Sequence, residues 1–147
     1  MKHHFSVTPR IIAHFGEDLI KNESIAILEL VKNSYDACAT ESKVEFFSEN
    51  KILKRITILD NGCGMDADII KNVWLVVGTD NKKKIKRNQC GRYPLGEKGI
   101  GRLGVHKLGR KIRVFSKTAQ DKEVELSIDW TKLENAKQID DFDIDVI

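Results

Sequence analysis

The sequence predicts a single domain of the α/β type, in which α-helices and β-strands both contribute. Its 147 residues fit one domain, and 41% hydrophobic with 32% charged residues is ordinary for a globular chain. Segments with helical spacing of apolar residues occur along the same chain as short apolar or alternating segments typical of strands. No apolar run approaches the roughly 20 residues of a membrane span, and no secretory signal is visible, so we expect no membrane association.

The first half of the chain is expected to contain three helices and two strands. Asp66 is a suitable N-cap for the third helix, in which apolar residues recur at helical spacing (Ile69, Ile70, Val73 and Trp74). The elements before it are, in order, a short helix at Pro9–Phe15, a helix at Glu23–Cys38, a strand at Lys43–Phe47, a loop at Ser48–Lys54 and a strand at Arg55–Asp60.

The second half begins with a long Gly-, Lys- and Asn-rich segment, Gly78–Gly104, and long loops of this kind are typical of lids or binding segments. A short helix is expected to start near its end, at Leu103–Leu108. Strands are predicted at Lys111–Ser116 and Glu123–Ile128, the second from strict alternation. A last alternation of Phe142, Ile144 and Val146 with aspartates resembles a strand cut off by the end of the sequence. We therefore expect the chain to be part of a longer protein.

Charge and cysteine content restrict the classes of partner and compartment. The net charge of +3, from 25 basic and 22 acidic residues, is too balanced to indicate nucleic-acid binding over the whole surface. The basic run Lys82–Arg87 is interpreted as a solvated segment, with nucleic-acid contact as the less favoured alternative. The three cysteines, Cys38, Cys63 and Cys90, fit neither a disulfide framework nor a zinc cluster, which indicates a reducing cytoplasm.

The helix Glu23–Cys38 carries the first chemical signal. At about 100° per residue, Glu29, Asn33 and Asp36 share one narrow stripe, flanked by the small residues Ala26 and Ala37. One interpretation is an amphipathic helix whose acidic stripe meets water. The other is a metal–phosphate site, in which an amide oxygen ligates a hard cation and Glu29 orients or deprotonates a water.

The second signal is the run Asp60-Asn61-Gly62-Cys63-Gly64-Met65, directly after an apolar strand. An Asn-Gly pair favours a tight turn, and a turn alone would explain the run. Alternatively, Asp60 at the strand end needs donors, and the exocyclic amine of adenine is one. Gly62 and Gly64 would then let a flat ligand approach the backbone.

The third signal is the glycine run from Gly96 to Gly104. A flexible loop is the simplest interpretation, since the run fits neither a dinucleotide fingerprint nor a P-loop. It can also present successive backbone N–H groups to phosphate oxygens at the start of a helix, with Lys98 adding a cation.

In this order and context, the three segments resemble the three boxes of the GHKL ATPases, the superfamily with the Bergerat fold. It includes type II topoisomerase ATPase domains, ninety-kilodalton heat-shock chaperones, sensor histidine kinases, MutL and MORC proteins. The resemblance implies a two-layer sandwich, with a mixed β-sheet covered by helices on one face. It also implies that residues 1–147 are the N-terminal part of an ATP-binding domain, with residues 78–104 as the ATP lid. The boxes are Glu29-x-x-x-Asn33-x-x-Asp36-Ala37, Asp60-x-Gly62-x-Gly64 and Gly96-x-x-Gly99-x-Gly101.

The resemblance also implies cofactors and residue roles. ATP and Mg²⁺ would be the cofactors, Glu29 the general base, and Asn33 the ligand of Mg²⁺. Asp60 would hydrogen-bond the adenine amine, and Asp36 would lie near the adenine pocket. The remaining candidates are the adenine-pocket residues Gly62, Gly64 and Met65, the lid glycines Gly96, Gly99 and Gly101, and the lid or phosphate contacts Thr79, Lys82 and Lys98.

The run from Glu29 to Ala37 looks more like the hydrolysing branches, those of the chaperones, MutL and MORC, than like the histidine kinases. The expected function is Mg-ATP binding and, in the intact protein, hydrolysis coupled to lid closure and to homodimerisation through the N-terminal region. Two alternatives stay open: phosphoryl transfer to histidine, and a non-catalytic nucleotide-sensing or protein-interaction module. A strand residue after the lid that contacts phosphate in the family, often Thr, has no match before Ile147, so this chain by itself is expected to bind nucleotide and hydrolyse it poorly.

Overall fold

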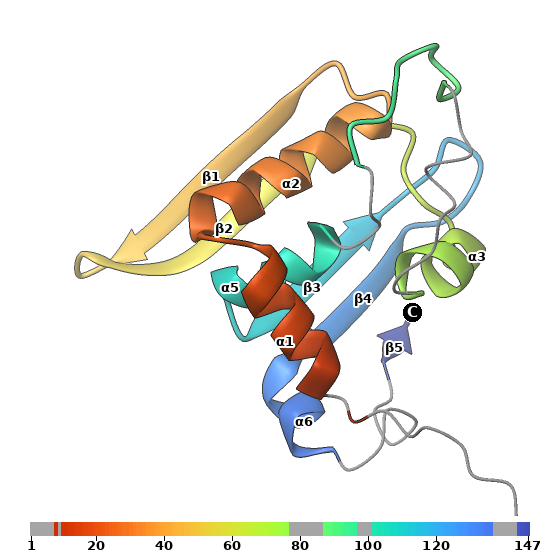
Figure 1. The fold of residues 1–147 in the computed structure, drawn as a ribbon. Helices are drawn as coiled ribbons and strands as arrows, with labels where there is room; N and C mark the ends of the chain where they lie inside the picture. The colour runs from red at the N-terminus through yellow and green to blue at the C-terminus, as the bar shows by residue number, and fades with distance from the viewer. Residues whose placement is uncertain (1–7, 9, 77–86, 97–100, 137–143) are drawn as a thin grey trace, which may run out of the picture.

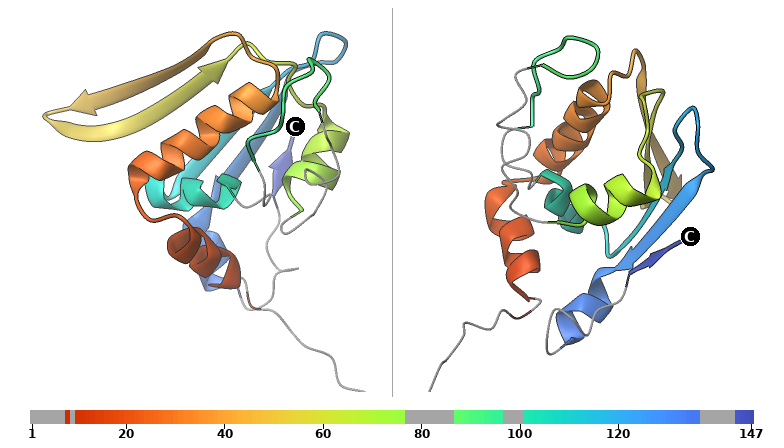
Figure 2. Two further views of the ribbon diagram at one scale, coloured as in Figure 1. Left: turned by 45° about the horizontal axis from the view of Figure 1, so that its top comes forward. Right: turned by 90° about the vertical axis from the view of Figure 1, so that its right-hand side faces the viewer.

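The fold consists of α-helices and two antiparallel β-sheets (Figure 1). Helices α1 (Arg10–Leu19) and α2 (Glu23–Asp36) lie on the same side of the three-stranded sheet, as both views in Figure 2 show. The computed structural model describes residues 8, 10–76, 87–96, 101–136 and 144–147.

Helix α2 begins and ends where local chemistry favours it. The side chain of Asn22 accepts a hydrogen bond from the Ile25 N–H at 3.0 Å, which satisfies one of the free donors of the first turn. The helix ends at Asp36, two residues before the predicted end, because Cys38 has a left-handed backbone with φ of 64°. The prediction of this helix is otherwise confirmed.

Strands β1 (Ser42–Glu49) and β2 (Ile52–Asp60) form a hairpin that extends away from the body of the molecule, alongside α2 (Figures 1 and 2). They are joined by Asn50 and Lys51, both with positive φ (49° and 62°), which is the geometry of a tight two-residue turn. The predicted loop at Ser48–Lys54 is therefore wrong. Both strands continue into it, with one irregularity in register between Phe47 and Ser48.

The third predicted helix starts as expected, since Asp66 accepts a hydrogen bond from the Ile69 N–H at 2.7 Å. Only one α-helical turn, α3 (Ala67–Ile69), follows, and the chain continues as a π-helix, η1 (Ile70–Trp74). The wider winding changes which side chains face inward. Ile70 is fully buried, whereas Ile69 and Val73 are each 40% exposed.

The main core lies on the second sheet, in which the central strand β4 (Val124–Asp129) pairs with β3 (Lys111–Ser116) and β5 (Asp145–Val146). The predicted alternation is confirmed on β4, where the apolar positions are buried. After β4, helix α6 (Trp130–Asn135), which the sequence did not predict, adds two buried side chains. The core residues are Ile70, Val124, Leu126, Ile128, Trp130 and Leu133.

The α/β class, with helices against a sheet, is confirmed, and one detail is corrected. The described strands pair only antiparallel and form two sheets, where a single mixed sheet was expected. In the predicted lid, residues 78–86 and 97–100 lie outside the described residues. The predicted helix after it is present as a short 3-10 turn, η2 (Gly101–Gly104), followed by α5 (Val105–Leu108). None of the described helices has the length and apolar character needed to cross a bilayer.

Candidate functional site

The α2 helix places the predicted polar stripe on one face, because Glu29, Asn33 and Asp36 all lie within its regular part. The Glu29 carboxylate forms an ion pair with Lys32, with Oε1 and Nζ 2.6 Å apart and both side chains largely covered. Glu29 is therefore held toward the next turn of its own helix. Residues of the other two boxes contact this face of α2 or lie directly beside it.

The aspartate at the end of β2 is bound to this helix by a hydrogen bond. The buried Ser34 hydroxyl donates to Asp60 Oδ2 at 3.0 Å, and the Gly62 N–H donates to Asp60 Oδ1 at 2.9 Å. Each carboxylate oxygen can still accept another donor, since it has two acceptor positions. The Asp60 side chain is thus fixed in direction while keeping the capacity to bind an amine.

The two glycines after Asp60 are required by close approach. A β-carbon at Gly62 would lie 2.7 Å from the Ala37 carbonyl oxygen, and the Cys63 N–H donates to that same oxygen at 2.8 Å. Gly64 has φ of 71°, and a β-carbon there would lie 2.0 Å from the Lys117 carbonyl oxygen. The run bends at Gly62, but neither Asn61 nor Gly62 has positive φ, so the Asn-Gly tight turn of the simpler interpretation is not what the structure shows. The run is packed directly against the end of α2.

Met65, which follows the run Asp60–Gly64, is half-buried and packs against the core cluster of the second sheet. The Met65 N–H donates to the Ser116 hydroxyl at 2.7 Å, and this hydrogen bond connects the second box to the end of β3. The predicted contact of Met65 with adenine stays a prediction.

The start of the glycine box is bonded to the end of α2. The N–H groups of Leu95 and Gly96 donate to Asp36 Oδ1 and Oδ2 at 2.8 and 3.2 Å. Asp36 therefore supports the backbone just before the lid glycines, a role that the sequence reasoning did not assign to it.

The last glycine of the box, Gly101, lies beside Glu29, the first residue of the polar stripe. A β-carbon at Gly101 would lie 2.8 Å from Glu29 Oε2 and 3.2 Å from Glu29 Cβ. The glycine thus allows the backbone at the start of η2 to touch the Glu29 side chain. The structure brings Glu29, Asn33, Asp36, Asp60, Gly62, Gly96 and Gly101 together on or against α2. The candidates Thr79, Lys82, Lys98 and Gly99 lie outside the described residues.

The prediction that the cysteines form no disulfide is wrong. Cys38 and Cys90 form a disulfide with their Cα atoms 6.0 Å apart, although 52 positions separate them in sequence. Cys63 is a free, exposed cysteine. The pairing depends on residues 87–96 folding back onto the end of α2, and nothing in the spacing of three cysteines reveals such a contact.

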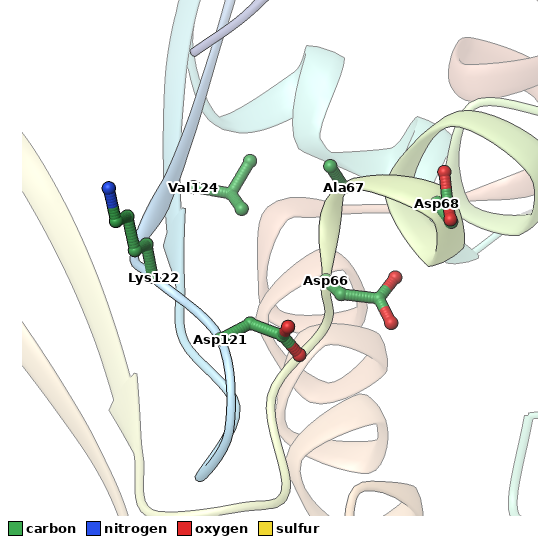
Figure 3. A pocket seen from close by; sticks show the side chains of 6 residues that line it. All are labelled: Asp66, Ala67, Asp68, Asp121, Lys122 and Val124. Carbon is green, nitrogen blue, oxygen red and sulfur yellow. The ribbon is translucent and has the colours of Figure 1, made fainter.

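A separate pocket of about 310 Å³ lies where the start of α3 faces the β3–β4 connection (Figure 3). Two of its carboxylates serve local structure, since Asp66 caps α3 and Asp121 Oδ2 accepts from the Thr118 hydroxyl at 2.6 Å. In the described part of the chain, no group of three or more His, Cys, Asp or Glu side chains is arranged to hold a metal ion. A magnesium site built on Asn33 and phosphate oxygens would not form such a group. The pocket is lined by Asp66, Ala67, Asp68, Asp121, Lys122 and Val124.

Comparison with known proteins identifies the family. The family model described as histidine kinase-, DNA gyrase B-, and HSP90-like ATPase matches residues 21–146. The chain belongs to this ATPase family. The match includes all three boxes, so the resemblance predicted from them is confirmed.

Two kinds of curated relative of this ATPase-family chain are similar to it over most of its length. The chaperone protein HtpG of Campylobacter jejuni is 30% identical over 137 residues, which cover 86% of this chain and 22% of HtpG. A protein named "Putative type II restriction enzyme HgiDII", from Herpetosiphon aurantiacus, is 31% identical over 103 residues, which cover 70% of this chain and 16% of that protein. The chain thus spans about a fifth of the length of these relatives.

Three residues that the sequence reasoning missed hold the boxes and the neighbouring segments against α2. Ser34 is 3% exposed and donates to Asp60, and its place beside Asn33 in the first box was the available signal. Asn61 Oδ1 accepts from the N–H groups of both Thr40 and Glu41 at 2.9 Å, which holds the loop after α2 against the second box. Arg92 donates to the Tyr35 carbonyl in the last turn of α2 and to the Ala39 carbonyl just beyond it, and only the folded chain reveals that contact.

Proposed function

We propose that this chain binds Mg-ATP between α2 and the glycine box and that the intact protein hydrolyses it, with closure of the lid at residues 78–104. The observation that supports this proposal is the convergence of three separate sequence boxes on one face of α2. Asp60 is bonded to Ser34, Gly96 to Asp36, and Gly101 lies against Glu29. These contacts link the strand end, the helix and the glycine run, the three parts that a nucleotide must touch together.

At the strand end, Asp60 is the residue we assign to adenine recognition. Its two oxygens are oriented by Ser34 and Gly62, and each retains an acceptor position for an exocyclic amine. A carboxylate whose direction is fixed before binding loses little side-chain entropy on contact. A β-carbon at Gly62 would lie 2.9 Å from Asp60 Oδ1, and the glycine there leaves this oxygen open.

On the helix, Asn33 is the residue we assign to Mg²⁺, because its amide oxygen is a hard ligand between Glu29 and Asp36. The ion would offset the charge of the phosphate groups. Backbone N–H groups of the glycine box, with Lys98, are proposed to bind the phosphate oxygens.

Glu29 is proposed to orient a water for attack on the terminal phosphate. Its Oε1 is occupied by Lys32, while its Oε2 lies on the side of Gly101. One oxygen is thus anchored, and the other faces the end of the glycine box. A positioned carboxylate of this kind contributes to phosphoryl transfer mainly by aligning the nucleophile.

The Glu29–Lys32 ion pair also supports a second candidate, a nucleotide-responsive module without turnover. A carboxylate paired to an ammonium at 2.6 Å must keep or exchange that partner when it activates water. In such a module, nucleotide binding would change the lid or partner contacts and no phosphate would be released.

The test uses the intact protein with ATP and Mg²⁺. Thermal stabilisation by the ligand is expected for the wild type and should be lost in Asp60→Ala. The variant Glu29→Ala should retain the stabilisation and lose phosphate release. Equal phosphate release by Glu29→Ala and wild type would exclude the role of Glu29, and absence of stabilisation in the wild type would exclude the binding proposal. Radiolabel transferred from ATP to the protein would instead favour phosphoryl transfer to histidine.

A further inference from the structure

Residues 87–96, here called the lid stem, are bonded to the C-terminal end of α2. Arg92 Nη1 donates to the carbonyl oxygens of Ala39 at 2.8 Å and Tyr35 at 3.2 Å. Its guanidinium also lies over the Tyr35 ring, 4.7 Å from the centroid. Tyr35 lies in the last turn of α2, where a cation is favourable, and Ala39 lies just beyond the helix end.

Two further links connect the lid stem to the same end of the helix. Asn88 Nδ2 donates to the Asp36 carbonyl oxygen at 3.1 Å, and Asn88 Oδ1 accepts from the Arg92 N–H at 2.7 Å. The Cys38–Cys90 disulfide adds a covalent connection. Contacts near the start, the middle and the end of the lid stem therefore hold it against the C-terminal end of α2.

Asp36 contacts the backbone where the glycine box begins. Both of its carboxylate oxygens accept backbone N–H groups, from Leu95 and from Gly96. Along the helix, Asp36 lies about 10 Å from Glu29, at 1.5 Å per residue. Gly101 closes the box beside Glu29. The two ends of the box are thus attached to two points on the stripe, with Asn33 between them.

We propose that Asp36 is a positioning residue that sets the starting point of the phosphate-binding glycine box and so controls affinity for the phosphate tail rather than for adenosine. This inference rests on the proposed function and extends it to a residue that the sequence had placed near the adenine pocket. Its basis is that Asp36 directs both oxygens at the backbone of residues 95–96. Loss of one acceptor would leave a backbone N–H facing an amide donor and would shift the first glycine.

The experiment measures the affinities of the intact protein for a non-hydrolysable ATP analogue with Mg²⁺ and for adenosine, titrated into the millimolar range. In Asp36→Asn, one carboxylate oxygen becomes an amide N–H donor. Hydrogen bonds to charged groups contribute about 1.5–3 kcal/mol, so we expect analogue affinity to fall about tenfold or more. Adenosine affinity should change less than about twofold. The melting temperature without ligand is recorded for each variant, to separate affinity from folding.

A second variant tests the attachment of the lid stem to α2 by removing a side chain of the stem. Arg92→Ala removes the bonds to Tyr35 and Ala39, and it should also weaken analogue binding while sparing adenosine. The matched control is Arg113→Ala, which removes an exposed arginine paired with Glu125 on the β3–β4 sheet. The control should leave the ratio of the two affinities unchanged.

The outcomes separate this inference from the proposed function. A wild type that binds neither ligand refutes the proposed function and the inference together. A wild type that binds the analogue, with Asp36→Asn and Arg92→Ala binding as tightly, refutes the inference alone. Equal losses for adenosine and analogue would place Asp36 in the adenine pocket or in overall folding, and would also refute it. A loss specific to the phosphate-bearing ligand, at an unchanged melting temperature, supports it.

Discussion

The two ends of the α2 stripe differ in how the rest of the chain holds them. At the Asp36 end, the second box and the lid stem are joined to the helix by hydrogen bonds, a stacked arginine and a disulfide. At the Glu29 end, the contacts described are an ion pair within the helix and the close approach of Gly101. Within the described residues, more polar and covalent links join distant segments to the Asp36 end, here called the organised end, than to the Glu29 end, here called the adaptable end.

The largest expected effect of a single substitution is at Gly64, on the organised side. Gly64→Ala would place a β-carbon 2.0 Å from a backbone carbonyl oxygen at a positive φ. We expect a loss of about 3 kcal/mol or more in the free energy of unfolding, because a backbone atom cannot move aside cheaply.

Chemical denaturation measures this loss, and Gly91→Ala is the matched control. Gly91 also has positive φ, 79°, yet a β-carbon there would meet nothing within 4 Å. It should therefore cost only about 1 kcal/mol, the penalty for a left-handed alanine. Equal losses for the two variants would contradict the close contact between the second box and Lys117.

The next largest effect is expected at the disulfide. Cys90→Ser opens a crosslink between residues 52 positions apart. The chain-entropy model gives about 4 kcal/mol for a loop of that size, and disulfides typically contribute about 2–4 kcal/mol. The free energy of unfolding should fall by this amount in non-reducing buffer. With a thiol reductant present, wild type and variant should differ little.

Cys63→Ser, which replaces the free exposed cysteine, is the control for this measurement. It should leave stability nearly unchanged under both conditions. If Cys90→Ser were as stable as wild type in non-reducing buffer, the covalent link at the organised end would be absent in solution.

A smaller effect on stability is expected at the adaptable end. Gly101→Ala would bring a β-carbon within 2.8 Å of Glu29 Oε2, the far end of a flexible side chain. That carboxylate can rotate away, but Glu29 Cβ at 3.2 Å must also shift slightly, so the free energy of unfolding should fall by about 1–2 kcal/mol. Displacement of Glu29 should nevertheless lower ATP turnover in the intact protein about tenfold, with affinity for ATP changed less than about threefold. A stability loss as large as that of Gly64→Ala would remove the contrast between the two ends.

The smallest effect is expected outside both ends, at the cap of α6. The Thr131 hydroxyl donates to Asp129 at 2.6 Å, and this hydrogen bond lowers the pKa of the Asp129 carboxyl below its usual value. A lowered pKa in the folded state means that the contribution to stability is present above the usual pKa and is lost as pH falls below about 4. Asp129→Asn should show a slightly weaker acid dependence of its melting temperature than wild type. Identical acid profiles would contradict this assignment.

The sequence predicts strands in both sheets, and the sheets differ in burial. Leu126 on β4 is fully buried, whereas Phe46 on β1 is 60% exposed. Pattern alone locates strands because each side chain alternates between two faces. It does not say which sheet will be covered, since that depends on where α1, α2 and α6 pack.

Local signals account for what the sequence determined about this protein. The cap at Asp66, the helix bearing Glu29 and Asn33 and the strand ending at Asp60 all depend on neighbours within a few positions. Their order, together with that of the glycines, indicated an ATPase family. The tertiary structure decided what depends on distant segments meeting: the Cys38–Cys90 disulfide, the hydrogen bond from Ser34 to Asp60, and the attachment of the lid stem to Asp36. Those contacts join residues 26 to 60 positions apart, and the chain can form them only after the helices and sheets have packed.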